Sequence, residues 1–177
     1  EMFFTSNKGK EKLKIEYSDK KTAFINDKKE NNFTNIAGHF CAVVFSPDDL
    51  SLIKGGPNER RKFIDLTIGQ IYPRYISILK NYNKALLQRN KIIKDYKYDK
   101  SLDILLDVFE KEIAENGEKI IKYRENIINK LSLPFEKIYS DLSKQKEKAT
   151  IKYKPNEKEN LREKLKEKRK ECIRFLI

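Results

Sequence analysis

The hydrophobic pattern of the chain has a period of two residues near its start and a period of three or four residues through its middle. Residues 11–26 alternate: Leu13, Ile15 and Tyr17 share one side, residues 18–21 supply turn-forming side chains, and the apolar run resumes at 23–25. This period of two predicts a β-hairpin. The run CAVVF, residues 41–45, is apolar at every position, which predicts a central strand buried on both faces. The first part of the chain should therefore be rich in β-structure.

A short helix is predicted directly after this run. Ser46 can accept hydrogen bonds from the free N–H groups at a helix start, and Pro47 suits the first helical position. Asp48 and Asp49 follow where the helix dipole favours negative charge. The Gly pair at 55–56 ends the helix after about one turn.

Longer helices follow, each with a recognisable start. Pro57 begins the second helix, whose apolar stripe is Phe63, Ile64, Ile68 and Ile71. Pro73 begins the third, which runs to about residue 95 with the apolar face Ile76, Leu79, Leu86 and Leu87. After a loop at YKYDK, residues 96–100, a pattern of threes and fours extends over 101–143 through Leu102, Leu105, Phe109, Ile113, Ile120, Ile127 and Leu131.

These long segments predict an antiparallel helix pair beside the sheet. Pro134 should kink or end the second of them. TIKYK, residues 150–154, alternates again and predicts a strand, and residues 159–172 predict a Lys/Glu-rich surface helix. Because the final run IRFLI is strand-like and has nothing after it to pair with, we expect a piece of a longer polypeptide whose other segments complete the sheet.

Charge is distributed unevenly along the 177 residues. The chain has 39 Lys and Arg against 27 Asp and Glu, a formal net charge of +12. Residues 46–98 and 148–177 each carry a net +6, whereas residues 99–147 between them carry −2. A genome whose codons favour lysine could explain the total net charge. Two basic segments separated by an acidic one, however, favour a positive electrostatic potential on one side of the molecule, which would attract phosphate.

Several classes of site are disfavoured. Cys41 and Cys172 are too far apart in the sequence for a disulfide framework or a zinc motif, so we expect reduced, buried thiols in a cytosolic protein. His39 is the single histidine, which argues against a catalytic triad or a His-based metal cluster and favours a structural role. No apolar run approaches the ~20 residues of a membrane-spanning helix.

Common phosphate and metal motifs are absent. The sequence contains no G-x-x-x-x-G-K-[ST], no G-x-G-x-x-G and no H-E-x-x-H. PDDL followed by ERRK loosely resembles a metal-dependent nuclease pattern, but the spacing is poor and helix capping by Asp48 and Asp49 is the better explanation. Against a background of lysine, the arginines stand out because a guanidinium binds phosphate or carboxylate with two parallel hydrogen bonds. Local ion pairs, such as Arg61 with Asp65, are the alternative.

The region from residue 43 to residue 90 resembles a known family. VVFSPDDLSLIKGGPNERRKFIDLTIGQIYPRY and YNKALLQRN look like the central part of RecF, the bacterial DNA replication and repair family. The matched features are Phe-Ser-Pro-acid-Asp-Leu, the run from Lys54 to Asp65, and Gln-Arg-Asn at 88–90. Weaker similarity extends to FINDK on one side and to GEKIIKYRENIINKL and IKYKP on the other.

The resemblance implies an α/β fold, part of an ATPase head of the ABC type. Residues 1–45 would be strands of lobe I, 46–147 a mainly helical lobe II, and 148–177 a strand and basic helix returning to the ATPase part. The family uses ATP and Mg²⁺, dimerises on DNA near single-strand gaps, and acts with RecR and RecO to load RecA in the cytoplasm. This chain lacks the phosphate-binding loop, the signature motif and the acidic metal-binding strand, so we expect no bound cofactor and no ATP hydrolysis by this chain alone.

The resemblance also suggests roles for particular residues. Ser46, Pro47, Asp48 and Asp49 would lie at the hinge between the lobes, where ABC heads carry a nucleotide-sensing loop, although the usual Gln is missing. The candidate DNA contacts are Lys54, Arg60, Arg61, Lys62, Arg74, Arg89 and Lys91. Two other classes of function stay open: a protein-interaction lobe without DNA contact, and the metal-dependent nuclease.

Overall fold

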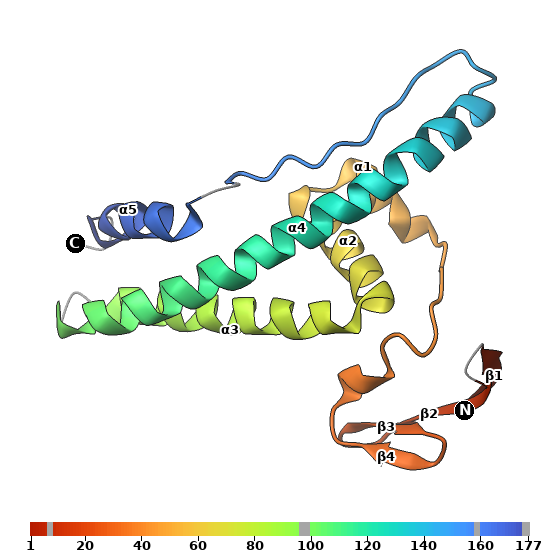
Figure 1. Cartoon of the computed structure of the whole chain (residues 1–177), viewed down its shortest axis with the longest axis horizontal. Helices are drawn as coiled ribbons and strands as arrows, with labels where there is room; N and C mark the ends of the chain where they lie inside the picture. The colour runs from red at the N-terminus through yellow and green to blue at the C-terminus, as the bar shows by residue number, and fades with distance from the viewer. Residues whose placement is uncertain (7–8, 96–99, 158–159, 175–177) are drawn as a thin grey trace. The chain divides into compact units, whose positions relative to one another are not determined.

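The structure, a computed structural model, describes residues 1–6, 9–95, 100–157 and 160–174. The chain forms two compact units, Glu1–Ile76 and Ser77–Ile177 (Figure 1). The first holds the sheet and the short helices, and the second holds the long helices. The division into 1–45, 46–147 and 148–177 is functional and stays a prediction.

The first unit opens with a four-stranded antiparallel sheet of strand order β1-β2-β3-β4. Its strands are β1 (Met2–Ser6), β2 (Gly9–Tyr17), β3 (Lys21–Ile25) and β4 (Lys28–Glu30). The predicted hairpin is confirmed, with Leu13 opposite Ile25 in the β2–β3 register. Asn26 and Asp27 both have positive φ, 50° and 64°, which suits the two-residue turn that joins β3 to β4.

The predicted strand at residues 41–45 is absent, and that prediction was wrong. The segment forms no regular secondary structure and pairs with no strand of the described chain. Val43, Val44 and Phe45 have exposed fractions of 100%, 79% and 92%. A run that is apolar on both faces needs a partner strand at each edge and a covering layer on each side, and the described residues supply neither.

Helices complete the first unit, and their starts were predicted correctly. The 3-10 helix η2 (Pro47–Leu50) leads into α1 (Ser51–Lys54), and α2 (Pro57–Ile71) follows the glycine pair. Of the predicted apolar stripe on α2, Ile68 is fully buried, whereas Phe63 and Ile71 are about half exposed. Tyr75, also fully buried, donates a 2.5 Å hydrogen bond from its hydroxyl to Asp65.

The second unit is built on a confirmed antiparallel helix pair. Helix α3 (Pro73–Asp95) and helix α4 (Asp103–Leu142) are joined by a short connection that includes η3 (Lys100–Leu102). Tyr82 of α3 lies against Gly117 of α4, and Arg89 lies against Glu110. Because the α4 partner moves back along its helix as the α3 residue number rises, the two helices run in opposite directions (Figure 1). Pro134 lies inside α4 and does not end it.

Helix α5 (Leu161–Arg174) packs on the same pair. A Cβ added to Gly117 would lie 3.4 Å from the Tyr82 ring and 3.5 Å from Leu161, so three helices meet at this glycine. Absence of a side chain there lets them approach closely. The surface helix predicted at residues 159–172 is thus confirmed.

One face of α4 is buried along most of its length. The residues on that face share helical spacing and include Leu106, Glu110, Ile113, Gly117, Ile120 and Ile127. Leu105, which the sequence placed on the buried face, is instead exposed. The apolar spacing continues to the end of the helix, but Ile138 and Leu142 have exposed fractions of 60% and 79%. The C-terminal third of α4 therefore presents an uncovered apolar stripe.

Two further expectations need correction or lie outside the described residues. Residues 150–154 form no strand, because the described chain offers them no neighbouring strand. The predicted loop at 96–100 falls outside the described residues except for Lys100, which begins η3.

Cys41 is exposed rather than buried, because it lies in the uncovered segment at residues 41–45, and Cys172 is half-buried; both are free thiols. None of the described helices combines the length and apolar character that crossing a membrane requires.

Candidate nucleic-acid interface

The hinge candidates form a defined helix start. The backbone N–H of Ser46 donates to Asp49 Oδ2 at 2.7 Å, and the N–H of Asp49 donates to the Ser46 carbonyl at 3.0 Å. Pro47 occupies the first position of η2, and Asp48 lies in its first turn. Asp49 therefore caps the start of η2 as predicted, whereas the role of the four residues as a hinge between lobes stays a prediction.

Five of the candidate cations lie in the first unit, and all five are exposed: Lys54, Arg60, Arg61, Lys62 and Arg74. Arg60 Nη1 donates to the carbonyls of Gly55 at 3.0 Å and Leu52 at 3.4 Å, so it caps the C-terminal end of α1. Arg61 donates to the side-chain oxygen of Asn58, three residues earlier in the sequence. Arg60 and Arg61 are thus held near the α1–α2 corner with charge still facing solvent.

Arg89 and Lys91 lie in the second unit, and their environments differ. Lys91 is exposed. The Arg89 side chain is 6% exposed; its Nε donates to Glu110 Oε1 at 3.0 Å, and its Nη2 donates to the Leu165 carbonyl at 3.3 Å. A guanidinium occupied in this way joins α3 to α4 and α5. Its placement gives no support to direct contact with DNA.

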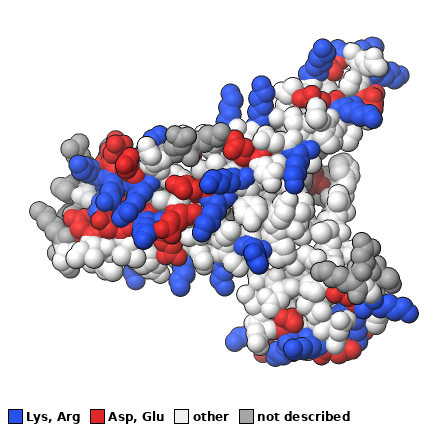
Figure 2. Space-filling view, in the orientation of Figure 1, with Lys and Arg blue, Asp and Glu red and all other residues white. Residues whose placement is uncertain are grey.

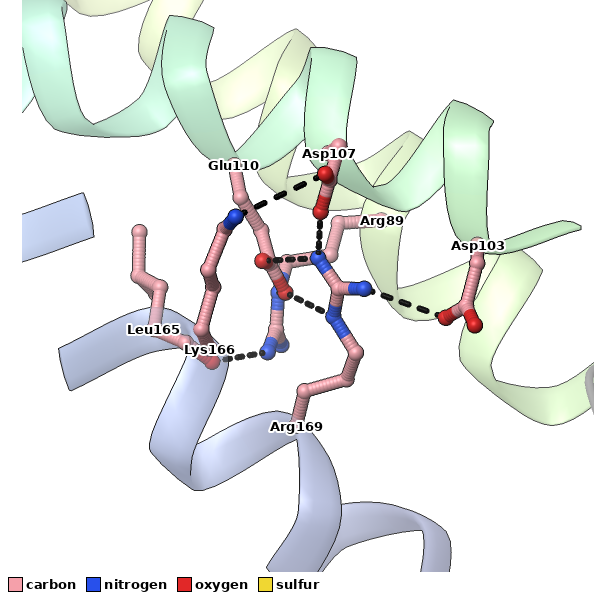
Figure 3. A network of polar contacts seen from close by, with 7 residues as sticks. All are labelled: Arg89, Asp103, Asp107, Glu110, Leu165, Lys166 and Arg169. Atoms are coloured by element: carbon pink, nitrogen blue, oxygen red, sulfur yellow. Dashed lines mark hydrogen bonds and ion pairs between the residues drawn. The ribbon is translucent and has the colours of Figure 1, made fainter. Parts of the chain in front are cut away.

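Glu110 and Arg169 form the centre of the buried network around Arg89 (Figure 3). Glu110, whose side chain is 0% exposed, accepts from Arg169 Nε at 3.1 Å and from Arg169 Nη2 at 2.5 Å in addition to Arg89. Arg169 also reaches Asp103, at 3.1 Å from Nη1, and Asp107. One arginine of α5 therefore contacts three carboxylates spaced along one face of α4.

Arg169 shifts the pKa of one of its carboxylate partners, Asp107. Its hydrogen bond to Asp107, reinforced by charge attraction, lowers the pKa of that carboxyl despite partial burial. The hydrogen bond to Glu110 is the largest cause that raises the pKa of Arg169 itself. Both shifts favour the charged forms, so the pairing of α5 with α4 is ionic at neutral pH.

The sequence analysis missed this network. Glu110 lies between Leu106 and Ile113 on the apolar face of α4, and a charged residue in such a stripe predicts a buried partner of opposite charge. The partner in α5 could not be identified in this way, because several basic residues of that helix were equivalent candidates.

The described residues offer neither a metal site nor a phosphate cradle. No group of three His, Cys, Asp or Glu side chains within the described ranges could hold a metal ion. Gly55 and Gly56 have φ of −82° and −78°, ordinary extended values, and separate α1 from α2 as a simple helix break.

Comparisons with known proteins agree on one family. The chain is 38% identical over 153 residues to the DNA replication and repair protein RecF of Acetivibrio thermocellus, and 40% identical over 146 residues to that of Streptococcus suis. These matches cover 85% and 82% of this chain. A solved structure of RecF with ATP matches 95% of the chain at 33% identity with a TM-score of 0.80. The chain belongs to the RecF family.

The extent of the RecF match limits what can be transferred. The chain spans 42% and 40% of the length of these curated relatives and 48% of the RecF chain solved with ATP. A second solved RecF, described as a recombination mediator in the RecFOR pathway, matches 94% of the chain with a TM-score of 0.83. No protein-family model matches the chain. The fold of the sheet and helices is that of the corresponding part of RecF.

Proposed function

We propose that this chain is the part of a RecF-type protein that contacts the DNA phosphate backbone near single-strand gaps. In this proposal the whole protein binds ATP and Mg²⁺ through other segments, dimerises on DNA when ATP is bound, and acts in the cytoplasm with RecR and RecO to load RecA. The observation that carries it is the match to solved RecF along 94% of the chain at 33% identity.

Exposed cations support the DNA contact. Lys54, Arg61, Lys62 and Arg74 are exposed in the first unit and Lys91 in the second. Contacts of Lys and Arg with phosphate supply most sequence-independent affinity for DNA and make it sensitive to salt. Arg89 is left out of this set because its guanidinium is buried against Glu110.

Charge reversal of an adjacent pair tests the contact. Arg61→Glu with Lys62→Glu changes two exposed side chains of α2 and leaves the Arg60 cap in place. Lys28→Glu with Lys29→Glu in β4 is the matched control, because it makes the same charge change at two exposed positions of the same unit. Fluorescence anisotropy with labelled DNA, titrated at several salt concentrations, measures affinity and salt dependence.

Each lost phosphate contact should lower the slope of log affinity against log salt by about 0.7 on single strands or about 0.9 on duplex. The α2 pair should therefore lose about 1.4–1.8 units of slope, and the β4 pair should lose little. Equal slopes for both pairs and the unchanged chain would refute contact through α2.

One observation favours the interaction lobe as a second candidate. Leu131, Ile138 and Leu142 are exposed on α4 at helical spacing, and an apolar stripe of this kind typically packs against protein. If the chain shows no DNA binding even at low salt, this second function replaces the first. The nuclease alternative gains no support, since Asp49 is engaged as a cap and the described residues hold no metal cluster.

A further inference from the structure

The segment between α4 and α5 has an alternating exposure pattern. Residues 148–155 form neither helix nor strand, and a bend follows at Asn156; Figure 1 shows this run as a drawn-out trace between α4 and α5. The odd-numbered residues Ala149, Ile151, Tyr153 and Pro155 are half-buried, and the even-numbered residues Lys148, Thr150, Lys152, Lys154 and Asn156 are exposed. An extended chain that packs one of its two sides against a surface shows this alternation of half-buried and exposed residues. Every lysine of the segment faces away from the buried side.

These lysines are not neutralised by the described part of the chain. Residues 148–156 contain three lysines and no acidic residue. The acidic residues at either end are engaged elsewhere: Glu147 accepts from the Tyr139 hydroxyl at 2.6 Å, and Glu157 pairs with Lys164. Figure 2 shows Lys or Arg side chains standing off this segment into solvent.

The spacing of the row suits a repeating anion. Two residues of extended chain advance about 6.6 Å, so Lys152 and Lys154 present charges at about that interval, with the Thr150 hydroxyl and Lys148 continuing the row. Neighbouring phosphates along one nucleic-acid strand are separated by a comparable distance. A solvated lysine face would need no such regular row, whereas a phosphodiester strand running parallel to the segment could meet each position in turn.

We propose that Lys148, Lys152 and Lys154, with Thr150, form a lysine row that binds the phosphodiester backbone of DNA. The proposal rests on the proposed function and deepens it, because it adds a second contact site in the other compact unit. The row recognises backbone phosphates without reading bases, so binding should be independent of sequence.

The test compares two triple variants of the 177-residue chain. In the first, Lys148, Lys152 and Lys154 become Ala. In the control, Lys111, Lys119 and Lys122 become Ala; they are equally exposed but lie on α4, in the acidic segment. Circular dichroism checks that both variants fold. Anisotropy measures their affinity for a labelled oligothymidylate and for a duplex of the same length, across about 50–200 mM salt.

Loss of three contacts should lower the salt slope by about 2 on the single strand or by about 2.7 on the duplex, and should weaken binding on the order of tenfold or more at low salt. The form of DNA, single-stranded or duplex, on which the triple variant loses more of its salt slope is the form that the lysine row binds. The control triple should change the slope by well under one unit. Two further variants sharpen the result: Lys→Arg at all three positions conserves charge and should keep the slope, whereas Thr150→Lys adds a charge and should raise the slope by about 0.7.

The outcomes separate the two proposals. If the lysine-row variant keeps its slope on both DNAs while the α2 pair loses slope, the lysine row is overturned and the proposed function stands. If the unchanged chain binds neither DNA at about 50 mM salt, both are overturned. If the control triple loses as much slope as the row, general charge rather than this row binds DNA, and the proposal is again overturned.

Discussion

Replacing Glu110 with Gln should loosen the second unit more than any other single isosteric change within it. Glu110 is completely buried and accepts hydrogen bonds from both Arg89 and Arg169. The amide of Gln keeps the volume but removes the negative charge, so two guanidinium groups lose the ion that compensates them. Breaking a buried pair in this way typically costs about 3–5 kcal/mol.

The partners of each arginine place the expected cost near the lower end of that range. Arg169 retains Asp103 and Asp107, whereas Arg89 retains the Leu165 carbonyl and no carboxylate among the described residues. We therefore expect a loss of about 3 kcal/mol in the free energy of unfolding, a large part of the 5–15 kcal/mol typical of a domain. The matched control is Glu115→Gln on the same helix. Its ion pair with Lys111 spans 3.9 Å between side chains that are 58% and 61% exposed, and such pairs contribute about 0–1 kcal/mol.

Urea denaturation followed by circular dichroism, with hydrogen exchange of peptides from α4 and α5, measures the effect. The exchange data assign the loss to the helices around the network rather than to the sheet unit. A third variant, with Arg89→Met, Glu110→Leu and Arg169→Met together, should recover most of the lost stability, because well-packed apolar groups can replace a buried ionic network. Equal midpoints for Glu110→Gln and Glu115→Gln would refute the argument that the buried charge is needed.

The remaining predictions concern two glycines and one titrating pair. Gly38→Ala should destabilise the first unit by about 2 kcal/mol, measured by thermal unfolding, because Gly38 has φ +85° and an added Cβ would lie 2.5 Å from Pro73 Cγ. Gly117→Ala should be tolerated and Gly117→Leu should not, since 3.4 Å of clearance admits one methyl group; hydrogen exchange of α5 distinguishes them. The pKa of Asp107 is lowered by Arg169, so its stabilisation is present above the ordinary pKa of 3.8 and is lost as pH falls through the lower folded value. The protection of α5 amides, measured as exchange relative to the intrinsic rate at each pH, should therefore fall in acid, and should fall less in Arg169→Met.

Features determined by neighbouring residues were predictable from the sequence. The helix starts at Pro47, Pro57 and Pro73 and the break at 55–56 all follow from local backbone chemistry, and the structure places them where the sequence did. The β2–β3 hairpin is equally local, since its strands are separated by a short turn.

Features that depend on residues far apart in the sequence were not predictable from the sequence. Residues 41–45 and 150–154 have strand-like sequences, but a strand needs a neighbour, and the described chain provides none. Arg89 was predicted to contact DNA because a guanidinium can bind phosphate with two hydrogen bonds; it is instead buried against Glu110, which lies 21 residues further along the chain. The site prediction therefore identified exposed cations correctly where local sequence decided exposure, as at Lys62, and failed where a long-range pair decided it.

The order in which the buried network can assemble follows from its sequence separations. Arg89 and Glu110 close a loop of 21 residues, whereas Arg169 must return across 59 residues to reach the same carboxylate. Closing the longer loop costs about 0.9 kcal/mol more in chain entropy. During synthesis the helical hairpin can therefore form and pair its first charges before the last helix exists. Helix α5 then packs onto a helix pair that has already formed, and we expect α5 to be the first part to detach when the protein unfolds.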